Sequence, residues 1–250
     1  MTEIHLPLGW GVGIPLGDTF RPGSETAAQR INRVLLATKA EWFQTWEPFG
    51  FHDSPLFIPS AEDASIPAMQ LDRAKNSTLL VLNEPERGWN KELVNPHDAA
   101  LATTRQLAQL WQIGEPFGWV APNCMINGKN LDWLASYADW LWKHGNITPT
   151  AWGIHFYGQK ANEINYHVDN FWRWHDRYGR SAPVVVSEFG PGGNATIQQA
   201  LTVMEYGRRF LDDDRDRVLG TAYFAAGVKY MGHYDLCAEQ LLLDHFVDIR

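Results

Sequence analysis

Short apolar or aromatic runs recur along this chain at a spacing of about 30 residues, the length of one β-strand followed by one α-helix. Segments with helical periodicity fill most of the gaps between these runs. Strands that alternate with helices pair in parallel through right-handed crossovers. The pattern therefore predicts an α/β protein built on a parallel sheet.

The runs that we predict to be strands lie at Leu8–Pro15, Glu41–Trp46, Leu56–Pro59, Thr78–Asn83, Gly118–Pro122, Ala151–Tyr157, Pro183–Glu188 and Gly220–Ala225. Eight such units in 250 residues indicate a single (β/α)8 TIM barrel, with one domain from residue 1 to residue 250. An open doubly wound sheet is the alternative, but that fold usually carries a glycine-rich phosphate loop after its first strand. Gly9–Gly13 lacks the full spacing of such a loop, and we interpret it as close packing in the barrel wall.

The expected helices lie at Glu25–Ala40, Ser60–Ala74, Ala99–Ile113, Leu131–His144, Val168–Tyr178 and Ile197–Leu211. Ser24 is the expected N-cap of the first of these helices. Gly145 is expected to stop the helix that precedes it.

The composition limits the partners that this chain can have. A formal net charge of −8 disfavours a nucleic-acid binder, which usually has a basic face. No apolar run reaches the roughly 18 residues of a membrane-spanning helix, so no membrane partner is expected. The N-terminus has no secretion signal, which leaves the cytoplasm open, or secretion followed by removal of a signal. We expect a monomer.

Metal and cofactor sites are not expected. Cys124 and Cys237 are too few for a disulfide framework or a zinc cluster, and we expect two buried thiols, with one disulfide as the alternative. The histidines lack a metal-ligand spacing such as HExxH.

The 12 Trp, 12 Phe and 8 Tyr exceed what core packing alone explains. A pyranose has an apolar C–H face that lies flat on an aromatic ring, so this excess favours a carbohydrate partner.

Two of the predicted strands end at a glutamate, Glu84 and Glu188. A buried ionised carboxylate is costly unless it is paired or has a task. Chemistry in parallel barrels takes place at the C-terminal ends of the strands. The simpler interpretation of Glu84 is an acid that begins a helix, but no helix pattern follows Glu188. We therefore predict a catalytic pair.

Side-chain alternation predicts where the pair points. Leu80 and Leu82 share a face with Glu84, and Val184 and Val186 share a face with Glu188. We expect these apolar side chains to point into the barrel, which places both carboxylates over its mouth. Two carboxyl groups in that arrangement can hydrolyse a glycoside, one as acid and the other as nucleophile or base.

Three segments resemble the clan of barrel glycoside hydrolases with an acid/base on strand four and a nucleophile on strand seven. They are Leu80–Glu86, His155–Gly158 and Val185–Phe189, in that order. Within the clan, the chain is most similar to glycoside hydrolase family 128, the β-1,3-glucanases. The resemblance implies a retaining hydrolase, endo-acting on a β-linked glucan such as β-1,3-glucan or a related polysaccharide.

The resemblance also implies a role for each residue. Glu84 would be the general acid/base, Glu188 the nucleophile, and Asn83 a hydrogen-bond partner of the sugar hydroxyl next to the anomeric carbon. His155 and Tyr157 share one face of the sixth strand, and we expect them to keep Glu188 ionised and to contact sugar. This chemistry needs a protonated Glu84 and a charged Glu188 at rest.

The expected sugar platforms are Trp46, Trp89 and Tyr157. The clan often presents a Trp at the end of strand eight, where this chain has Tyr223 and Phe224, so one of these two would serve as a sugar platform.

Two other hypotheses about the function stay open at this point. One is a carbohydrate-binding protein on the same barrel without turnover, and the other is a barrel enzyme with a different class of substrate.

Overall fold

The structure is a computed structural model of the chain. It describes residues 9–16, 26–45, 57–58, 60–61, 78–88, 91–112, 118–192, 195–214, 216–224, 236–237 and 240–249.

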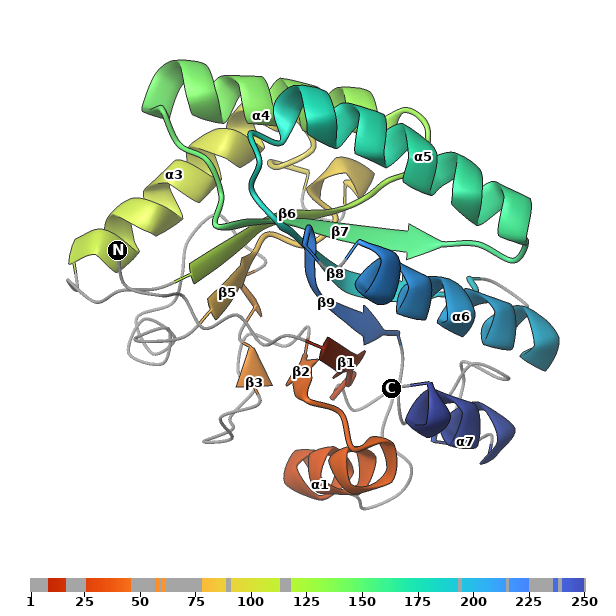
Figure 1. The fold of residues 1–250 in the computed structure, drawn as a ribbon. Helices are drawn as coiled ribbons and strands as arrows, with labels where there is room; N and C mark the ends of the chain where they lie inside the picture. The colour runs from red at the N-terminus through yellow and green to blue at the C-terminus, as the bar shows by residue number, and fades with distance from the viewer. Residues whose placement is uncertain are drawn as a thin grey trace.

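One curved parallel sheet runs through the molecule (Figure 1). Its strands pair in the order β3-β2-β1-β9-β8-β7-β6-β5-β4, so the first strand lies beside the last. The strands are β1 (Gly9–Gly13), β2 (Trp42–Gln44), β3 (Phe57–Ile58), β4 (Ser60–Ala61), β5 (Thr78–Val81), β6 (Gly118–Met125), β7 (Ala151–Tyr157), β8 (Val184–Gly190) and β9 (Val218–Tyr223). The predicted α/β class with a parallel sheet is confirmed.

Helices cover the outer face of this sheet (Figure 1). They are α1 (Ala27–Thr38), α3 (Pro96–Gln112), α4 (Asn130–Gly145), α5 (Ala161–Tyr178), α6 (Ile197–Asp213) and α7 (Gln240–Asp248), with a short 3-10 turn, η2 (Pro85–Arg87), after β5. None of the helices in the described ranges is long and apolar enough to cross a membrane.

Two separate apolar clusters show how the sheet is curved. The larger cluster fills the space between sheet and helices, and includes Trp10, Phe156 and Phe189. The smaller cluster takes a single side chain from each of seven strands: Trp42, Ile58, Leu80, Val120, Ala151, Val185 and Ala222. Side chains from seven strands can meet in one cluster only on the concave side of a rolled sheet. The sheet therefore encloses an apolar floor.

Most predicted elements are found, with differences at their ends. β6 continues past Pro122 to Met125. The N-cap of α1 is Thr26 rather than Ser24, because Thr26 and Gln29 form a reciprocal capping box. Helix α4 includes Gly145 and ends at the left-handed residue Asn146.

The predicted helix at Ser60–Ala74 is wrong at its start, where Ser60 and Ala61 form β4 beside β5. Residues 62–77 lie outside the described part of the chain. Helix α5 begins at Ala161, seven positions before the predicted Val168. Its first turns are rich in polar residues, which hides the apolar periodicity there.

The glycines of β1 act as predicted, as spacers in the sheet wall. A Cβ added to Gly11 would lie 2.3 Å from the indole of Trp42, which is fully buried.

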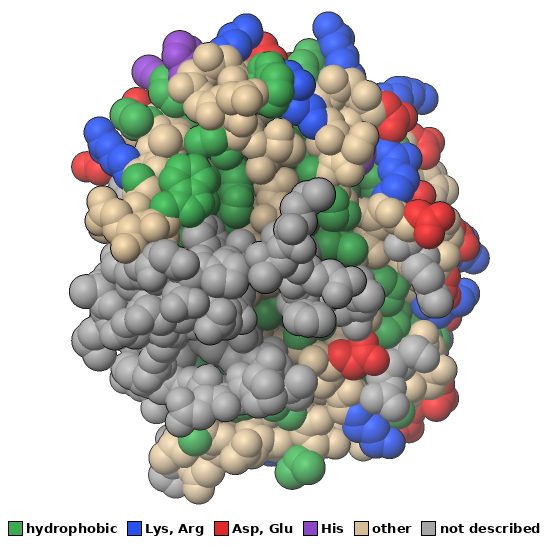
Figure 2. Space-filling view, turned by 60° about the vertical axis from the view of Figure 1, so that its left-hand side comes forward, with side chains coloured by type: hydrophobic (Ala, Val, Ile, Leu, Met, Phe, Trp, Pro, Cys, Tyr) green, Lys and Arg blue, Asp and Glu red, His purple; other side chains and the backbone are tan. Residues whose placement is uncertain are grey.

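On the face shown in Figure 2, basic and acidic side chains are interspersed over the described surface. The two cysteines form no disulfide, and Cys124 is buried whereas Cys237 is partly exposed.

Substitution of Gly207 by Ala tests the packing behind β8. The added Cβ on α6 would lie 2.4 Å from a ring carbon of Phe189, whose ring is buried against Trp10 and Phe156. We expect a loss of about 1–3 kcal/mol in the free energy of unfolding from overpacking. Helix propensity alone would give a gain of up to about 1 kcal/mol. Urea unfolding of the variant measures the difference.

The double variant Gly207→Ala, Phe189→Leu is the matched control. The smaller side chain makes room for the new methyl group, so the two substitutions are expected to cost less together than the sum of their separate costs. A Gly207→Ala protein more stable than the wild type would contradict the packing described here.

Candidate active site

The strands that carry the polar residues depart from regular geometry near their C-terminal ends. Leu82 and Glu84 have left-handed φ angles of 62° and 42° just after β5, and Asn123 has a φ of 54° within β6. The register between β8 and β9 shifts between Val186 and Phe189. A bulge of this kind changes which face of the sheet the following side chains occupy.

These irregularities correct the predicted side-chain alternation. Val184 and Val186 pack in the outer cluster, while Val185 lies in the inner one. Likewise Leu80 lies inside and Leu82 outside. The predicted faces of Leu82, Val184 and Val186 were therefore wrong, whereas Leu80 points inward as predicted. The bulge, not simple alternation, turns Glu188 toward the concave side.

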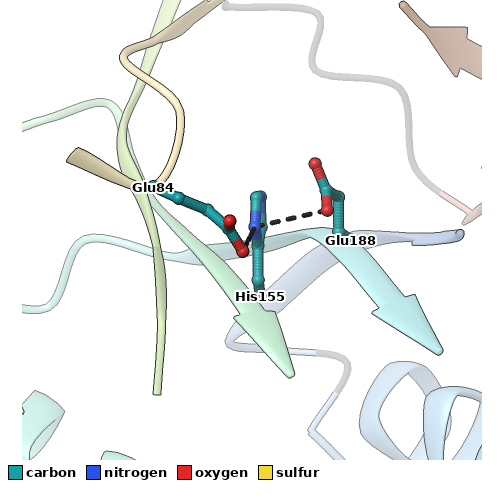
Figure 3. Close-up of side chains that lie close together, drawn as sticks. All are labelled: Glu84, His155 and Glu188. Atoms are coloured by element: carbon teal, nitrogen blue, oxygen red, sulfur yellow. Dashed lines mark hydrogen bonds and ion pairs between the residues drawn. The ribbon is translucent and has the colours of Figure 1, made fainter. Parts of the chain in front are cut away.

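Glu84, His155 and Glu188 meet at the C-terminal ends of β5, β7 and β8 (Figure 3). Nδ1 of His155 lies 3.3 Å from Oε1 of Glu84 and 3.4 Å from Oε2 of Glu188. Only 6%, 1% and 4% of Glu84, His155 and Glu188 is exposed, so water screens these groups little. One imidazole thus lies between two buried carboxylates at nearly equal distances.

The two carboxylates have different second partners. The hydroxyl of Tyr157 donates a hydrogen bond of 2.6 Å to Oε2 of Glu188. Nη1 of Arg87 donates to Oε2 of Glu84 at 3.2 Å, and the Arg87 side chain is 45% exposed. The hydrogen bond to Glu188 is the shorter and more sheltered of the two, and a bond of this type favours the ionised carboxylate.

Two opposing effects act on the pKa of His155. Burial lowers it, because desolvation disfavours the imidazolium. The negative charge of Glu188, the hydrogen bond to Glu84 and the charges of Glu84 and Glu86 raise it, and together they outweigh burial. The pKa of His155 is therefore above its usual value, which favours an imidazolium between the two glutamates.

A buried asparagine holds the strand ends together. Nδ2 of Asn123 donates to the carbonyl oxygens of Val81, Leu82 and Val120, each at 3.1 Å. Its Oδ1 accepts a hydrogen bond of 2.7 Å from the hydroxyl of Ser187, the neighbour of Glu188. Asn123 therefore links β5, β6 and β8.

Further contacts position the same strand ends. The backbone N–H of Glu84 donates to the carbonyl of Asn123 at 3.0 Å. The side-chain amide of Gln44 on β2 donates to the carbonyl of Ser187. The backbone of both glutamate-bearing segments is therefore tied to other strands of the sheet.

The structure places only some of the other residues that were predicted to bind substrate. Asn83 is partly exposed beside Glu84. Trp46 and Trp89 lie outside the described residues. Tyr223 is 0% exposed, and its ring packs edge-on against Phe189 and Phe246 in the outer cluster. The prediction that Tyr223 offers a sugar platform is wrong, because its side chain points away from the concave side.

Sequence reasoning missed Arg87, Glu86 and Ser187. Arg87 lies three positions after Glu84, a spacing that brings side chains together in a helical turn. Glu86 belongs to the same turn, and its Oε1 accepts a hydrogen bond of 2.9 Å from the backbone N–H of Met125. The sequence gives no signal for Ser187, whose contact with Asn123 spans 64 positions.

The cluster also has the donor set of a cation site. One ligand atom from each of Glu84, His155 and Glu188 lies within 4.8 Å of the other two. The same closeness serves acid/base chemistry, since two carboxyl groups that share a site differ in proton affinity. The three side chains can also exchange protons with one another, because Nδ1 of His155 interacts with both carboxylates.

Two buried carboxylates at the C-terminal ends of parallel strands are the arrangement that glycosidases use. The chain belongs to the family described as glycosyl hydrolase catalytic core, which matches residues 30–246. It is therefore a glycoside hydrolase by family. No curated protein matches this chain.

Solved structures share this fold. An endo-β-1,3-glucanase of family 128, subgroup I, from Amycolatopsis mediterranei, in complex with laminaritriose, has 20% sequence identity and a TM-score of 0.71. The match covers 96% of this chain and 99% of that chain. A subgroup II endo-β-1,3-glucanase from Sorangium cellulosum has 14% identity and a TM-score of 0.64, with 88% and 94% covered. A subgroup VI exo-β-1,3-glucanase from Aureobasidium namibiae has 18% identity and a TM-score of 0.61, with 86% and 83% covered.

Substitution of Asn123 by Asp tests the link between the strands. The side chain keeps its size, but an oxygen replaces the donor that serves Val81, Leu82 and Val120. We expect a loss of about 1–3 kcal/mol in stability from the unsatisfied buried groups. Misplaced carboxylates should also lower kcat for glycoside hydrolysis by about tenfold or more. Thermal unfolding and initial rates measure the two effects.

Ser187→Ala is the control for this experiment. It removes one hydroxyl partner and leaves the three carbonyl bonds of Asn123 in place, so its cost should be about 0.5–1.5 kcal/mol. Equal stability and equal activity of Asn123→Asp and the wild type would contradict the linking role.

Proposed function

We propose that this protein is a retaining, endo-acting glycoside hydrolase that cleaves β-1,3-glucan. The observation that carries the proposal is the buried pair of Glu84 and Glu188 on the two sides of the His155 imidazole. Three solved proteins of the same fold are described as β-1,3-glucanases, and two of these are endo-acting. That common substrate supports β-1,3-glucan here.

The spacing of the carboxylates supports retention of configuration. One oxygen of Glu84 and one of Glu188 lie within 4.8 Å of each other. Retaining enzymes place their carboxyl groups about 5–5.5 Å apart, and inverting enzymes about 6.5–9.5 Å apart to admit a water molecule. The short separation leaves room for attack on the sugar by a carboxylate.

In the first step, Glu188 attacks the anomeric carbon while Glu84 donates its proton to the leaving oxygen. A covalent glycosyl ester forms on Glu188, and the C–O bond to the leaving chain breaks. In the second step, Glu84 takes a proton from water, and the resulting hydroxide displaces Glu188. The sugar keeps its anomeric configuration and both glutamates return to their first states.

The contacts of the two glutamates support this division of roles. The 2.6 Å hydrogen bond from Tyr157 favours the ionised form that a nucleophile needs. Arg87 favours the ionised form that Glu84 adopts after it has given up its proton. Because Arg87 is 45% exposed, its contribution is screened by water, and Glu84 can still hold the proton at rest.

His155 fits the movement of charge between the two steps. The negative charge lies on Glu188 before attack and on Glu84 afterwards. Nδ1 is 3.4 Å from the first and 3.3 Å from the second. An imidazolium at this point stabilises the charge equally at both positions, so His155 lowers the cost of the transfer.

The remaining substrate contacts are proposed from the sequence. We assign Asn83, beside Glu84, to the sugar hydroxyl next to the anomeric carbon, and Trp46 and Trp89 to sugar stacking. Tyr157, which is partly exposed, would contact the sugar bound next to Glu188. The protein needs no cofactor for this reaction, and we expect it to act as a monomer.

We also propose that the sheet closes into a single-domain (β/α)8 barrel over residues 1–250. β3 pairs with β2 and β4 pairs with β5, and only residue 59 separates β3 from β4 in the chain. The inner cluster with one residue from each of seven strands supports closure. Both glutamates then lie at the same mouth of the barrel.

Substitution of each glutamate by glutamine tests the catalytic pair. Gln keeps the size of Glu but can neither donate the required proton nor attack the anomeric carbon. We expect kcat on laminarin to fall by about a thousandfold or more in Glu84→Gln and Glu188→Gln. Reducing-sugar release measures the rate, and NMR of the first product shows whether the β-anomer appears first. Unchanged activity in both variants would sink the proposal, and an initial α-anomer would refute retention.

Azide separates the two roles. With an aryl glycoside that needs no acid, Glu84→Ala should recover activity with azide and yield a β-glycosyl azide. Glu188→Ala should yield the α-glycosyl azide, since azide then attacks from the vacant side. The opposite result would exchange the roles of the two residues.

Tyr157→Phe tests the hydrogen bond to Glu188. Loss of the hydroxyl removes a donor that favours the ionised carboxylate, so the acid limb of the pH profile of kcat/KM should move to higher pH. We expect a shift on the order of one pH unit, with kcat about tenfold lower at the optimum. Tyr206→Phe on α6 is the matched control and should leave the profile unchanged. An acid limb that does not move would show that Tyr157 has no part in the ionisation of Glu188.

A further inference from the structure

Glu86 is a third carboxyl group beside the catalytic pair that the hydrolytic steps do not use. It belongs to η2, the turn that begins directly after Glu84. Oε1 of Glu86 accepts the 2.9 Å hydrogen bond from the N–H of Met125 on β6. Oε2 is buried and has no hydrogen-bond partner among the described residues. Glu86 therefore gives up hydration on one oxygen without a compensating bond, which is costly for a charged group.

The backbone contacts show what the bound oxygen does. Glu84 has a left-handed φ of 42°, unusual for a residue with a side chain. Its N–H donates to the carbonyl of Asn123, and two residues further along β6 Met125 donates to Glu86. These two bonds hold the turn against β6 and fix the direction in which the Glu84 side chain leaves the backbone.

Burial and charge also set the proton affinity of Glu86. Desolvation raises its pKa to about 7, against the lowering effects of the Met125 N–H and of His155, and with a further rise from the charge of Glu84. The coupling between Glu84 and Glu86 acts in both directions, as all linkage does. An ionised Glu86 therefore favours the protonated form of Glu84, the form that a general acid needs.

We propose that Glu86 is a positioning residue of this hydrolase, which holds the turn that carries Glu84 and, once ionised, keeps the proton on Glu84. The inference rests on the proposed function, because it assigns Glu84 as the acid. Glu86 itself touches no reacting atom. It acts through Glu84 and through the geometry of η2.

The groups around Glu86 determine whether loss of its charge raises or lowers the pKa of its neighbours. Glu84 and Arg87 belong to the same segment, Cys124 comes from β6 and His155 from β7. Burial raises the pKa of the Cys124 thiol, with further rises from Glu86 and Glu84, so this thiol stays neutral. The negative charge of Glu86 also raises the pKa of His155. Removal of that charge should make both Glu84 and His155 release their protons at lower pH.

Glu84 and Glu86 consequently titrate as a coupled pair. The microstate in which Glu86 is ionised and Glu84 holds the remaining proton keeps Glu84 active as an acid. Activity should then persist until the second proton leaves. Without the charge of Glu86, Glu84 loses its proton in a single step at lower pH.

The experiment compares the wild type with Glu86→Gln, which keeps an oxygen for the Met125 N–H but cannot ionise. The alkaline limb of kcat/KM on laminarin should move to lower pH, by on the order of one pH unit, and become a single ionisation. Asp139→Asn, which removes an equal charge from an exposed ion pair with Lys143, should leave the limb in place. An unchanged limb in Glu86→Gln would overturn the inference.

Two readouts need no substrate, so they separate this inference from the proposed function. NMR titration should give a lower His155 midpoint in Glu86→Gln than in the wild type. Thermal unfolding should show that the wild type loses stability relative to the variant as pH rises from 4.5 to about 7, since the folded state binds the Glu86 proton more tightly there. A wild type inactive on every β-glucan would refute the proposed function alone. Active wild type with an unchanged His155 midpoint would refute the role of Glu86 alone.

If Glu86→Gln does not fold, NMR titration of the wild type tests the coupling. The carboxyl carbon of Glu86 and the ring of His155 should then titrate with shared steps in NMR. Independent single-step titrations of these two groups would overturn the coupling.

Discussion

The structure depends on one contact, the imidazole of His155 between the carboxylates of Glu84 and Glu188. Two acids at this distance repel each other when both are ionised, and burial makes the repulsion stronger. A shared cation between them removes much of that cost. The same attraction raises the pKa of His155, because the two carboxylates stabilise the imidazolium. The two carboxylates can therefore stay close together without forcing the strand ends apart.

The polar site rests on an apolar floor. Leu80, Val120, Ala151 and Val185 fill the concave side of the sheet below the strand ends. Above them, Asn123 donates hydrogen bonds to carbonyl oxygens of Val81, Leu82 and Val120. Hydrogen bonds between buried polar groups favour one arrangement of the strand ends. The position of each carboxylate is thus set by the scaffold before any sugar binds.

The sequence predicted the parallel α/β class, most strand positions, the closeness of Glu84 and Glu188 at the strand ends, and the contacts of His155 and Tyr157 with Glu188. The contact of Asn123 with Ser187 could not be predicted, since 64 positions separate the two residues. Tyr223 was misplaced, because a strand has two faces and the sequence does not say which one is outside. Glu86 was overlooked, because burial of its carboxyl group arises from β6 and β7 and not from its own neighbours.

The register shift in β8 has a consequence for comparison between related chains. Val186 faces the helices, and Ser187 and Glu188 both contact groups on the concave side before Phe189 faces outward again. A relative whose β8 is regular could have the same residues at these positions and yet direct its glutamate toward the helices. An alignment that matches the glutamate alone does not establish an equivalent position of the carboxylate, because the extra residue before Phe189 must be inherited with it.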